Sequence, residues 1–292
     1  MLGEIQAIVF PVFALIGVGY LFARFRQIDL DSITHLTVYV LSPCLVFSSL
    51  VRRQIIWAEV GAVAGGAAAV VAGCGLLAFI LFGRSARRRS VYLPVMFMNS
   101  GNMGLPICLF AFGDFGLSRA VIYFVTVGII HVSAGVAIAS GDRSLHEVTR
   151  FPLIYAAILA LVLNIFDISL PGFLSNPIRL LGDATIPLML FSLGCQLRSV
   201  RISGLWAALA ASVLRIGGGL AIALAYTALF GITGVERSVI LLVSSMPAAV
   251  LNFMLARNYR LDTDFVSSVI LISTIMSIFT IPAVLYLISV VT

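Results

Sequence analysis

The chain has 292 residues, of which 61% are hydrophobic and 10% are charged. Soluble domains carry about 25% charged residues, so this composition is typical of a membrane protein and leaves no length for a sizeable soluble domain. The net charge is +6, and all 18 basic residues are arginine. The absence of lysine excludes a retinal Schiff base and a Walker A nucleotide site, and the arginines form no stripe that would bind nucleic acid.

Apolar runs follow one another along the whole chain, and a run of about 20 such residues spans a membrane as a helix. The ten runs cover residues 5–23, 33–51, 57–82, 90–112, 117–140, 151–166, 178–197, 203–230, 237–256 and 264–291. The first run begins with an acid, Glu4, and no small-residue cleavage site follows it, so we expect a spanning helix and not a removable signal. The sequence therefore predicts an all-α polytopic membrane protein of about ten helices.

Arginine is distributed unevenly between the two ends of these runs. If the N-terminus is outside, the inner arginines are Arg24, Arg26, Arg84, Arg87, Arg88, Arg89, Arg143, Arg150, Arg198, Arg201, Arg257 and Arg260. The outer arginines are Arg52, Arg53, Arg119, Arg179 and Arg237. An excess of basic residues marks the cytoplasmic side, and the cluster at residues 84–89 is suited to anionic lipid. We expect a bacterial inner-membrane protein with both termini on the periplasmic side.

The second half of the chain repeats features of the first half in the same order. Pro43 in the second run and Pro187 in the seventh are each followed, at four and five residues, by Phe-Ser. The third and eighth runs are rich in small residues, and the fourth and ninth runs begin with Ser-Val and break near their middle. Halves of five helices each must have opposite orientations, which is the inverted repeat of many secondary transporters. We expect repeats over residues 1–140 and 150–292, joined by a short cytoplasmic linker at 141–149.

Two of the apolar runs are interrupted near their middle by polar residues, glycine and proline. Residues 99–106 read NSGNMGLP in the fourth run, and the ninth run has a milder break around Pro247. Irregular polar backbone is tolerated at membrane depth where it lines a cavity, and half-helix N-termini suit anions. A simple proline kink is the alternative, and it has more weight in the ninth run. The substrate-binding residues that we expect are Asn99, Gly101, Asn102, Gly104, Pro106, Arg215, Pro247 and Asn252.

Three ionisable residues inside the predicted spans, away from the Arg and Glu residues at the span ends, are candidates for a functional role. Arg215 could bind a substrate carboxylate, because its guanidinium matches that geometry, or could pair with an acid or with carbonyls of a broken helix. Asp183 and His131 are candidates for ion coupling, although snorkelling or packing would also explain them. The four cysteines lie in apolar runs without metal-ligand spacing, so no metal and no cofactor are expected.

The two interrupted segments resemble the signatures of the auxin efflux carrier family. Residues 99–106 are similar to its helix-4 signature and residues 246–259 to its helix-9 signature, and the similarity extends over the whole chain. The family includes plant auxin carriers and bacterial proteins described as malate or malonate permeases. Asn252 stands near a position where plant members carry a second proline, and the long central loop of many plant members is absent, which weakens the case for auxin as substrate.

The resemblance implies an inverted repeat of five plus five helices, with a scaffold domain and a transport domain each drawn from both repeats. Helices 4 and 9 would cross at their breaks, and the transport domain would move as an elevator. The fold would be shared with bile-acid sodium symporters and sodium/proton antiporters.

These features together predict a secondary transporter of a small organic anion, such as an auxin-like monocarboxylate or a dicarboxylate. The alternatives are an ion channel and a sodium- or proton-coupled symporter of the bile-acid type. A membrane enzyme would need a cluster of acids, bases or metal ligands, and the sequence has none, so we expect no catalysis. The expected partners are the anion and membrane lipid, no nucleic acid is expected, and a homodimer is left open.

Overall fold

The computed structural model describes residues 2–51, 56–83, 85, 88–141, 151–198, 200 and 202–291. The predicted linker therefore lies almost wholly outside the described residues, as do Arg52, Arg53, Arg84, Arg87, Arg143, Arg150 and Arg201. The described chain is mostly helical, and it contains one isolated β-bridge between non-helical segments. Its elements, four of them short π-helical segments (η), are α1 (Leu2–Phe25), α2 (Leu30–Leu36), η1 (Thr37–Leu41), α3 (Ser42–Val51), α4 (Trp57–Phe82), α5 (Arg88–Met96), η2 (Ser100–Gly104), α6 (Leu105–Ile130), η3 (His131–Gly135), α7 (Val136–Ser140), α9 (Pro152–Ile165), α10 (Gly172–Leu197), α11 (Leu205–Val213), η4 (Leu214–Gly218), α12 (Gly219–Leu229), α13 (Gly234–Ser244), α14 (Leu251–Asn258) and α15 (Thr263–Val291).

The expectation of a polytopic helical membrane protein is confirmed. Seven segments of the described chain are long and apolar enough to cross a membrane: Gly3–Phe25, Leu30–Val51, Trp57–Phe82, Ser100–Ser140, Gly172–Leu197, Leu205–Leu229 and Thr263–Val290. The other predicted runs are shorter or divided. The sixth is the short helix α9, the ninth is split into α13 and α14, and the fourth is split between α5 and the start of α6.

The fourth and fifth predicted runs meet within α6, at a sharp bend. Gly113 has φ 62° and ψ −161° there, a backbone conformation that is essentially confined to glycine. The segment before this bend begins at Leu105, and the segment after it continues to Ile130. The long apolar segment Ser100–Ser140 therefore contains a half-helix and a full-length helix that point in different directions.

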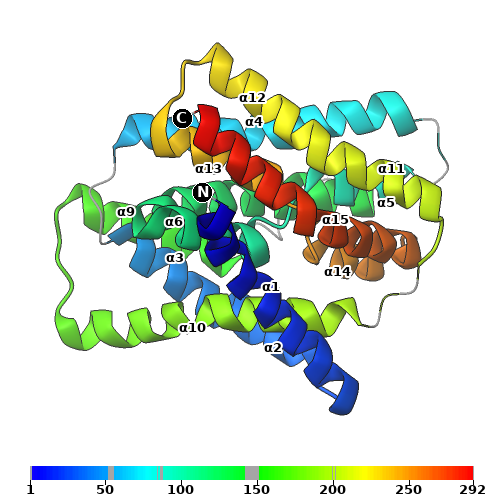
Figure 1. Cartoon of the computed structure of the whole chain (residues 1–292). Helices are drawn as coiled ribbons and strands as arrows, with labels where there is room; N and C mark the ends of the chain where they lie inside the picture. The colour runs from blue at the N-terminus through cyan, green and yellow to red at the C-terminus, as the bar shows by residue number, and fades with distance from the viewer. Residues whose placement is uncertain are drawn as a thin grey trace.

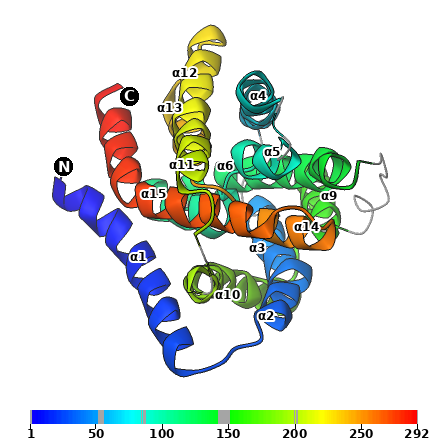
Figure 2. The same ribbon diagram turned by 90° about the vertical axis from the view of Figure 1, so that its right-hand side faces the viewer.

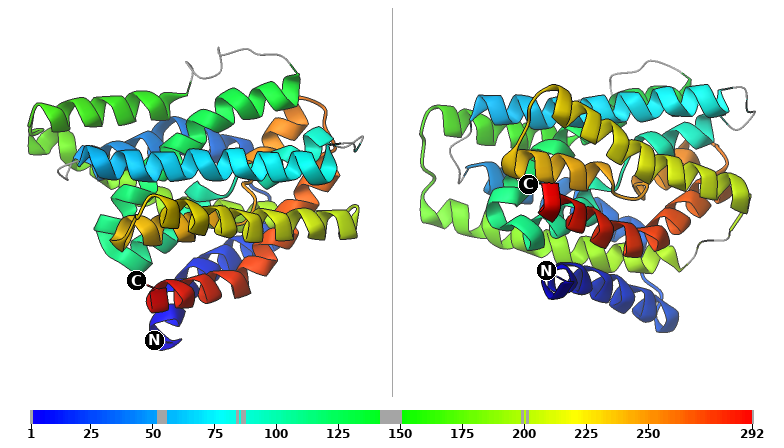
Figure 3. Two further views of the ribbon diagram at one scale, coloured as in Figure 1. Left: turned by 90° about the horizontal axis from the view of Figure 1, so that it is seen from above. Right: turned by 45° about the horizontal axis from the view of Figure 1, so that its top comes forward.

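The helices pack in two sets (Figures 1 and 2). In one set α1 lies along α10, α10 along α3, and α3 along α9. In the other set α4 packs on α5, α6, α12 and α13, while α11 packs on α15. The two chain ends lie near each other on one side of the molecule (Figure 3). We call the first set the α1/α10 bundle and the second the α4/α12 bundle.

Glycines set the closest helix approaches in both sets. A Cβ atom at Gly194 of α10 would collide with the backbone of α1 at Ile16, and one at Gly19 of α1 would collide with the backbone of Phe191. In α4, a Cβ at Gly73 would press against Ile222 of α12, 2.8 Å from its Cδ1 atom. Small residues let membrane helices approach and gain dispersion contacts, which explains the small-residue content of the third and eighth runs.

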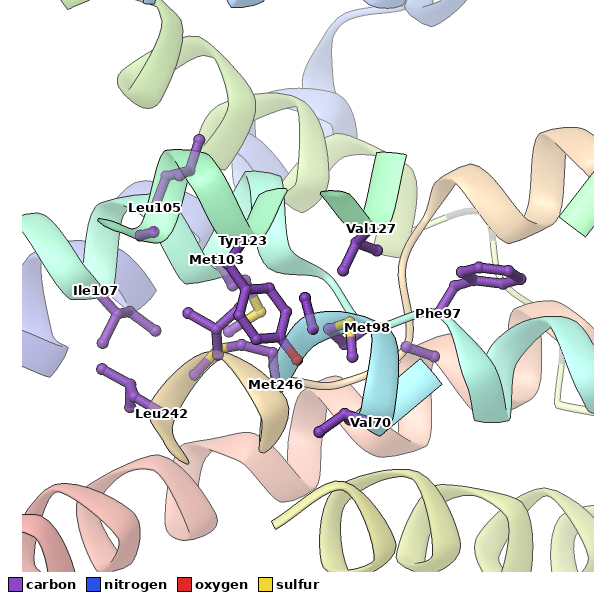
Figure 4. Close-up of a cluster of buried hydrophobic side chains, with 14 of the residues drawn as sticks. Val70, Phe97, Met98, Met103, Leu105, Ile107, Tyr123, Val127, Leu242 and Met246 are labelled. Carbon is purple, nitrogen blue, oxygen red and sulfur yellow. The ribbon is translucent and has the colours of Figure 1, made fainter. Parts of the chain in front are cut away.

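Fully buried side chains surround the two interruptions of the helices. Phe97 and Met98 come from the segment after α5, Tyr123 from α6, and Met246 from the segment after α13 (Figure 4). All four have a relative exposure of 1% or less. The irregular backbone is therefore held inside packed protein and away from lipid, as membrane burial requires.

A buried ion cluster joins three helices of the α4/α12 bundle. Arg119 of α6 is ion-paired with Glu59 of α4, and its Nε donates to Glu236 of α13 at 3.0 Å. Its guanidinium also lies over the ring of Phe115, with 3.5 Å from Cζ to the centroid. The Arg119 side chain is 6% exposed, so both carboxylates depend on it for compensation in a poorly solvated place.

We expect Arg119→Gln to lower the free energy of unfolding by about 3 kcal/mol, because it leaves two partly buried carboxylates facing each other. Thermal unfolding of the purified protein in detergent measures this loss. The control is Arg257→Gln, which breaks the exposed pair of Arg257 with Asp31 and should change stability by less than about 1 kcal/mol. Equal losses in the two variants would contradict the structural role given to Arg119.

Candidate functional site

The two interrupted helices contact each other through their non-helical segments at the centre of the structure. The segments after α5 and after α13 run antiparallel, with an isolated β-bridge between Met98 and Ala248. The N–H of Asn99 donates to the carbonyl of Pro247 at 2.7 Å, and the N–H of Ala249 donates to the carbonyl of Phe97 at 2.9 Å. We call this junction the crossing. It pairs backbone groups that would otherwise lack partners at membrane depth.

Polar side chains complete the hydrogen bonding at the crossing. The amide nitrogen of Asn252 donates to the carbonyl of Phe97 at 3.1 Å, and the hydroxyl of Ser273 accepts from the N–H of Ala248 at 3.1 Å. The side-chain oxygen of Asn99 accepts from the N–H of Asn102 at 3.1 Å and so caps the segment that leads into α6. Each of these polar residues therefore replaces a backbone partner that the helix break removed.

Arg215 of η4 binds the C-terminal ends of both half-helices. Its Nη1 donates to the carbonyls of Val95 and Met96 at 2.6 and 2.9 Å, and its Nη2 donates to the carbonyl of Ser244 at 2.9 Å. The side chain is 0% exposed, and no described carboxylate forms an ion pair with it. The last carbonyls of a helix carry about half a negative charge, so one guanidinium offsets the ends of α5 and α13 together.

A cavity of about 120 Å³ lies on the other side of the crossing, between it and the α1/α10 bundle. Its walls come from α2, η1, α3, η2, α6, η3, α9, α10 and α14 and from the broken segments. The lining residues are Thr34, Thr37, Val38, Ser42, Met98, Asn99, Ser100, Gly101, Asn102, Phe124, Val127, Gly128, His131, Phe151, Leu153, Met189, Ser192, Gln196, Ala249, Val250, Leu251 and Met254. This lining contains no aspartate, glutamate, lysine or arginine.

Buried polar atoms without a hydrogen-bond partner gather on this cavity. They are Thr37 Oγ1, Asn99 Nδ2, His131 Nε2 and Ser192 Oγ, on side chains whose residues are 8%, 3%, 3% and 6% exposed. Buried polar groups are nearly always paired, so four such atoms around one cavity indicate a place for a ligand or for water. Each of the four can donate a hydrogen bond, the amide nitrogen always and the other three in a suitable orientation or tautomer.

A wider cavity of about 570 Å³ adjoins the central one. The two share Thr34, Gln196, Val250 and Met254, and the wider cavity continues to Asp31 of α2 and Arg257 of α14. These last two side chains are paired at 3.3 Å and are exposed. The central cavity therefore adjoins open space toward the end of the molecule where α2 begins and α14 ends.

The structure brings only part of the expected site onto the cavity wall. Asn99, Gly101, Asn102 and His131 line it, and Asn252 is buried beside it at the crossing. Residues outside the lining are Gly104, Pro106, Arg215, Asp183 and Pro247, of which Arg215 lies behind the crossing and Asp183 is exposed on α10.

The hydroxyl residues on the wall were not among the expected ones, and two of them, Thr37 and Ser192, have an unpaired buried oxygen. Ser192 ends the Pro-x-x-x-Phe-Ser pattern that the seventh run shares with the second, so the repeat contained a signal for it. Thr37 has no such signal, because it enters the wall through the π-helical turn η1 and the packing of α2 against α10. Among the described residues, no group of His, Cys, Asp or Glu has a geometry that could hold a metal ion.

Comparisons with known proteins relate this chain to membrane transporters. The family model described as "Membrane transport protein" matches residues 5–144 and 136–285. An uncharacterized transporter of Methanocaldococcus jannaschii is 27% identical, over 93% of this chain and 94% of the relative. An uncharacterized transporter of Methanothermobacter thermautotrophicus is 29% identical, over 94% of this chain and 95% of the relative. The similarity therefore extends over nearly all of each protein.

The position of Arg215 can be tested through the neighbouring glycines. A Cβ at Gly219 would collide with Arg215 Nη2 and with the carbonyl of Ser244, whereas one at Gly217 would meet nothing within 4 Å. We expect Gly219→Ala to lower the unfolding free energy by about 1–3 kcal/mol. Gly217→Ala should be neutral or stabilising by up to about 1 kcal/mol, as for glycine to alanine in a helix. Thermal unfolding measures both, and equal stability of the two variants would contradict the described geometry.

Proposed function

We propose that this chain, which belongs to the membrane transport protein family, is a secondary transporter of a small organic anion. Membership of the family and the similarity to transporters support transport across a membrane, and they argue against an enzyme. The observation that supports an anionic substrate is the central cavity. Its wall has no charged side chain, and four unpaired polar atoms on it can donate hydrogen bonds.

The helix ends at the crossing give the cavity a positive potential. Leu251, the first residue of α14, lines it, and so do residues 100–102 at the start of the segment that continues into α6. Each helix N-terminus carries about half a positive charge, and the opposite half-helix ends are offset by Arg215 on the far side. No acidic side chain lines the cavity to reverse this potential. A cationic substrate would be repelled, whereas an anion would be attracted.

The rest of the wall favours an organic anion over an inorganic one. Most of the lining is apolar, including Phe124, Phe151, Met189, Leu251 and Met254. An apolar wall with a few hydrogen-bond donors is the usual composition of a site for a small organic molecule. We propose that the carboxylate lies against Asn99, Ser192 and Thr37, and that the carbon skeleton contacts the apolar side chains.

We also propose that two inverted repeats build the protein and that the α4/α12 bundle moves relative to the α1/α10 bundle. The packing supports this proposal because equivalent pairs of helices from the two halves pack together. Helix α1 lies along α10, and their counterparts α9 and α3 lie along each other. Likewise α4 packs on α5, and their counterparts α12 and α13 pack together. The cavity lies between the two bundles, which is where a sliding movement would expose it alternately.

Substitution of Asn99 tests the anion site with little change in shape. Asn99→Asp keeps the oxygen that accepts from the N–H of Asn102, but it replaces the unpaired Nδ2 donor with negative charge in the cavity. We expect counterflow of radiolabelled acetate, benzoate or succinate in proteoliposomes to fall by about tenfold or more, which corresponds to at least about 1.4 kcal/mol.

The matched control is Asn176→Asp, at an exposed position in the first turns of α10, which should transport normally. Counterflow is chosen because a carrier shows trans-stimulation and a channel does not. Unchanged carboxylate counterflow in Asn99→Asp would contradict the proposed site. Saturable transport of an organic cation, without competition from the three carboxylates, would overturn the anion assignment.

A further inference from the structure

His131 is the one titratable side chain among the residues that line the central cavity. It begins the π-helical segment η3, it is 3% exposed, and its Nε2 has no hydrogen-bond partner. The ring stacks on Phe97, with 4.2 Å between the centroids and 27° between the planes. The carbonyl of Phe97 accepts from the N–H of Ala249 and from Asn252. The imidazole is therefore fixed directly on the crossing and reaches the cavity.

The elements packed around this ring present polar but uncharged groups. Asn252 faces it from α14, Thr34 and Thr37 lie on the cavity wall from α2 and η1, and Ser192 and Gln196 lie there from α10. The start of α9 contributes Phe151 and Leu153, which are apolar.

The nearest charged groups lie away from the cavity wall. On α6 itself, Tyr123 turns its hydroxyl to Ser244. The guanidinium of Arg215 lies behind the crossing, and that of Arg89 lies against Gly141 at the end of α7. Asp31, Arg257 and Asp264 line the wider cavity and not the central one. No described carboxylate is therefore placed to compensate a positive charge on His131 when the cavity contains only water.

We propose that His131 takes up a proton when an organic anion binds, so that the protein moves its anion together with H⁺. The inference rests on the proposed function. In the empty cavity two helix N-termini already supply positive potential, which disfavours a second positive group. A carboxylate beside Nε2 supplies the missing negative charge, and the stacked Phe97 ring adds a cation–π contribution.

The proton balance is simple. Imidazole plus H⁺ from the water on one side gives imidazolium, which donates to the carboxylate, and release on the other side returns the proton and the anion together. Binding of the two is reciprocal, since whatever factor the anion adds to proton affinity, the proton adds to anion affinity. Anion binding should therefore weaken as pH rises above the range in which the loaded His131 is protonated.

Calorimetry of the purified full-length protein tests the proton directly. Acetate, benzoate and succinate are titrated in turn, at one pH near the ordinary histidine value of about 6.5, in two buffers with different ionisation enthalpies. The dependence of the measured heat on the buffer gives the protons taken up per bound anion. We expect about one-half to one proton for wild type, and an uptake near zero for His131→Gln with residual anion binding.

The matched control is His35→Gln, because His35 is an exposed histidine of α2 outside the cavity and its loss should leave proton uptake unchanged. His131→Asn serves if the glutamine variant does not fold, and the wild-type measurement needs no variant. Binding heat without buffer dependence, or proton uptake that survives loss of His131, would overturn this inference and leave the anion site intact. Absence of binding and of counterflow with all three carboxylates would instead overturn the proposed function.

Discussion

Two helices that stop at the centre of a membrane protein leave N–H and C=O groups that would cost several kcal/mol each if they faced hydrocarbon. In this chain the two interruptions satisfy each other. Asn99 donates to Pro247, Ala249 donates to Phe97, and Asn252 adds a side-chain bond to the same Phe97 carbonyl. Neither broken helix could exist here alone, so the two halves of the sequence must be folded together for either to be stable.

The crossing also places the negative and positive helix ends on opposite sides. Arg215 binds three carbonyls at the ends of α5 and α13, while the beginnings of α14 and of the segment leading into α6 face the cavity. The negative ends that Arg215 offsets belong to α5 and α13, whereas the positive ends at the cavity belong to other helices, so the guanidinium removes a negative potential that would otherwise oppose them. The buried arginine therefore acts on the cavity without touching it, and its place behind the crossing ties the stability of the fold to the potential at the proposed site.

This arrangement also relates packing to transport. The cavity lies where the α4/α12 bundle meets the α1/α10 bundle, so the movement proposed above would change the walls that enclose it. Helix α2 packs on α10 and α14 packs on α15, so the exposed Asp31–Arg257 pair links elements of the two bundles. An exposed pair is worth little free energy, so it can break and form again during a cycle. The buried Arg119 cluster lies within one bundle and would be preserved.

The sequence by itself determined the class of protein, the apolar runs and the two interruptions. These depend on local composition. A run of about 20 apolar residues is stable as a helix in the membrane, and a polar Gly/Pro segment inside such a run must be shielded from lipid by protein or line a cavity. It also pointed to Asn99, Gly101, Asn102 and His131, which do line the cavity.

Only the tertiary structure decided where the ionisable and hydroxyl groups lie. Arg215 had two interpretations in sequence, and the direction of its side chain depends on the position of the ends of α5 and α13, far from it along the chain. Asp183 is exposed because α10 turns its other face toward α3. Thr37 and Ser192 reach the wall through helix packing between the two halves of the chain. Periodicity within one helix cannot specify such contacts, since they are set by which surfaces of distant segments fit together.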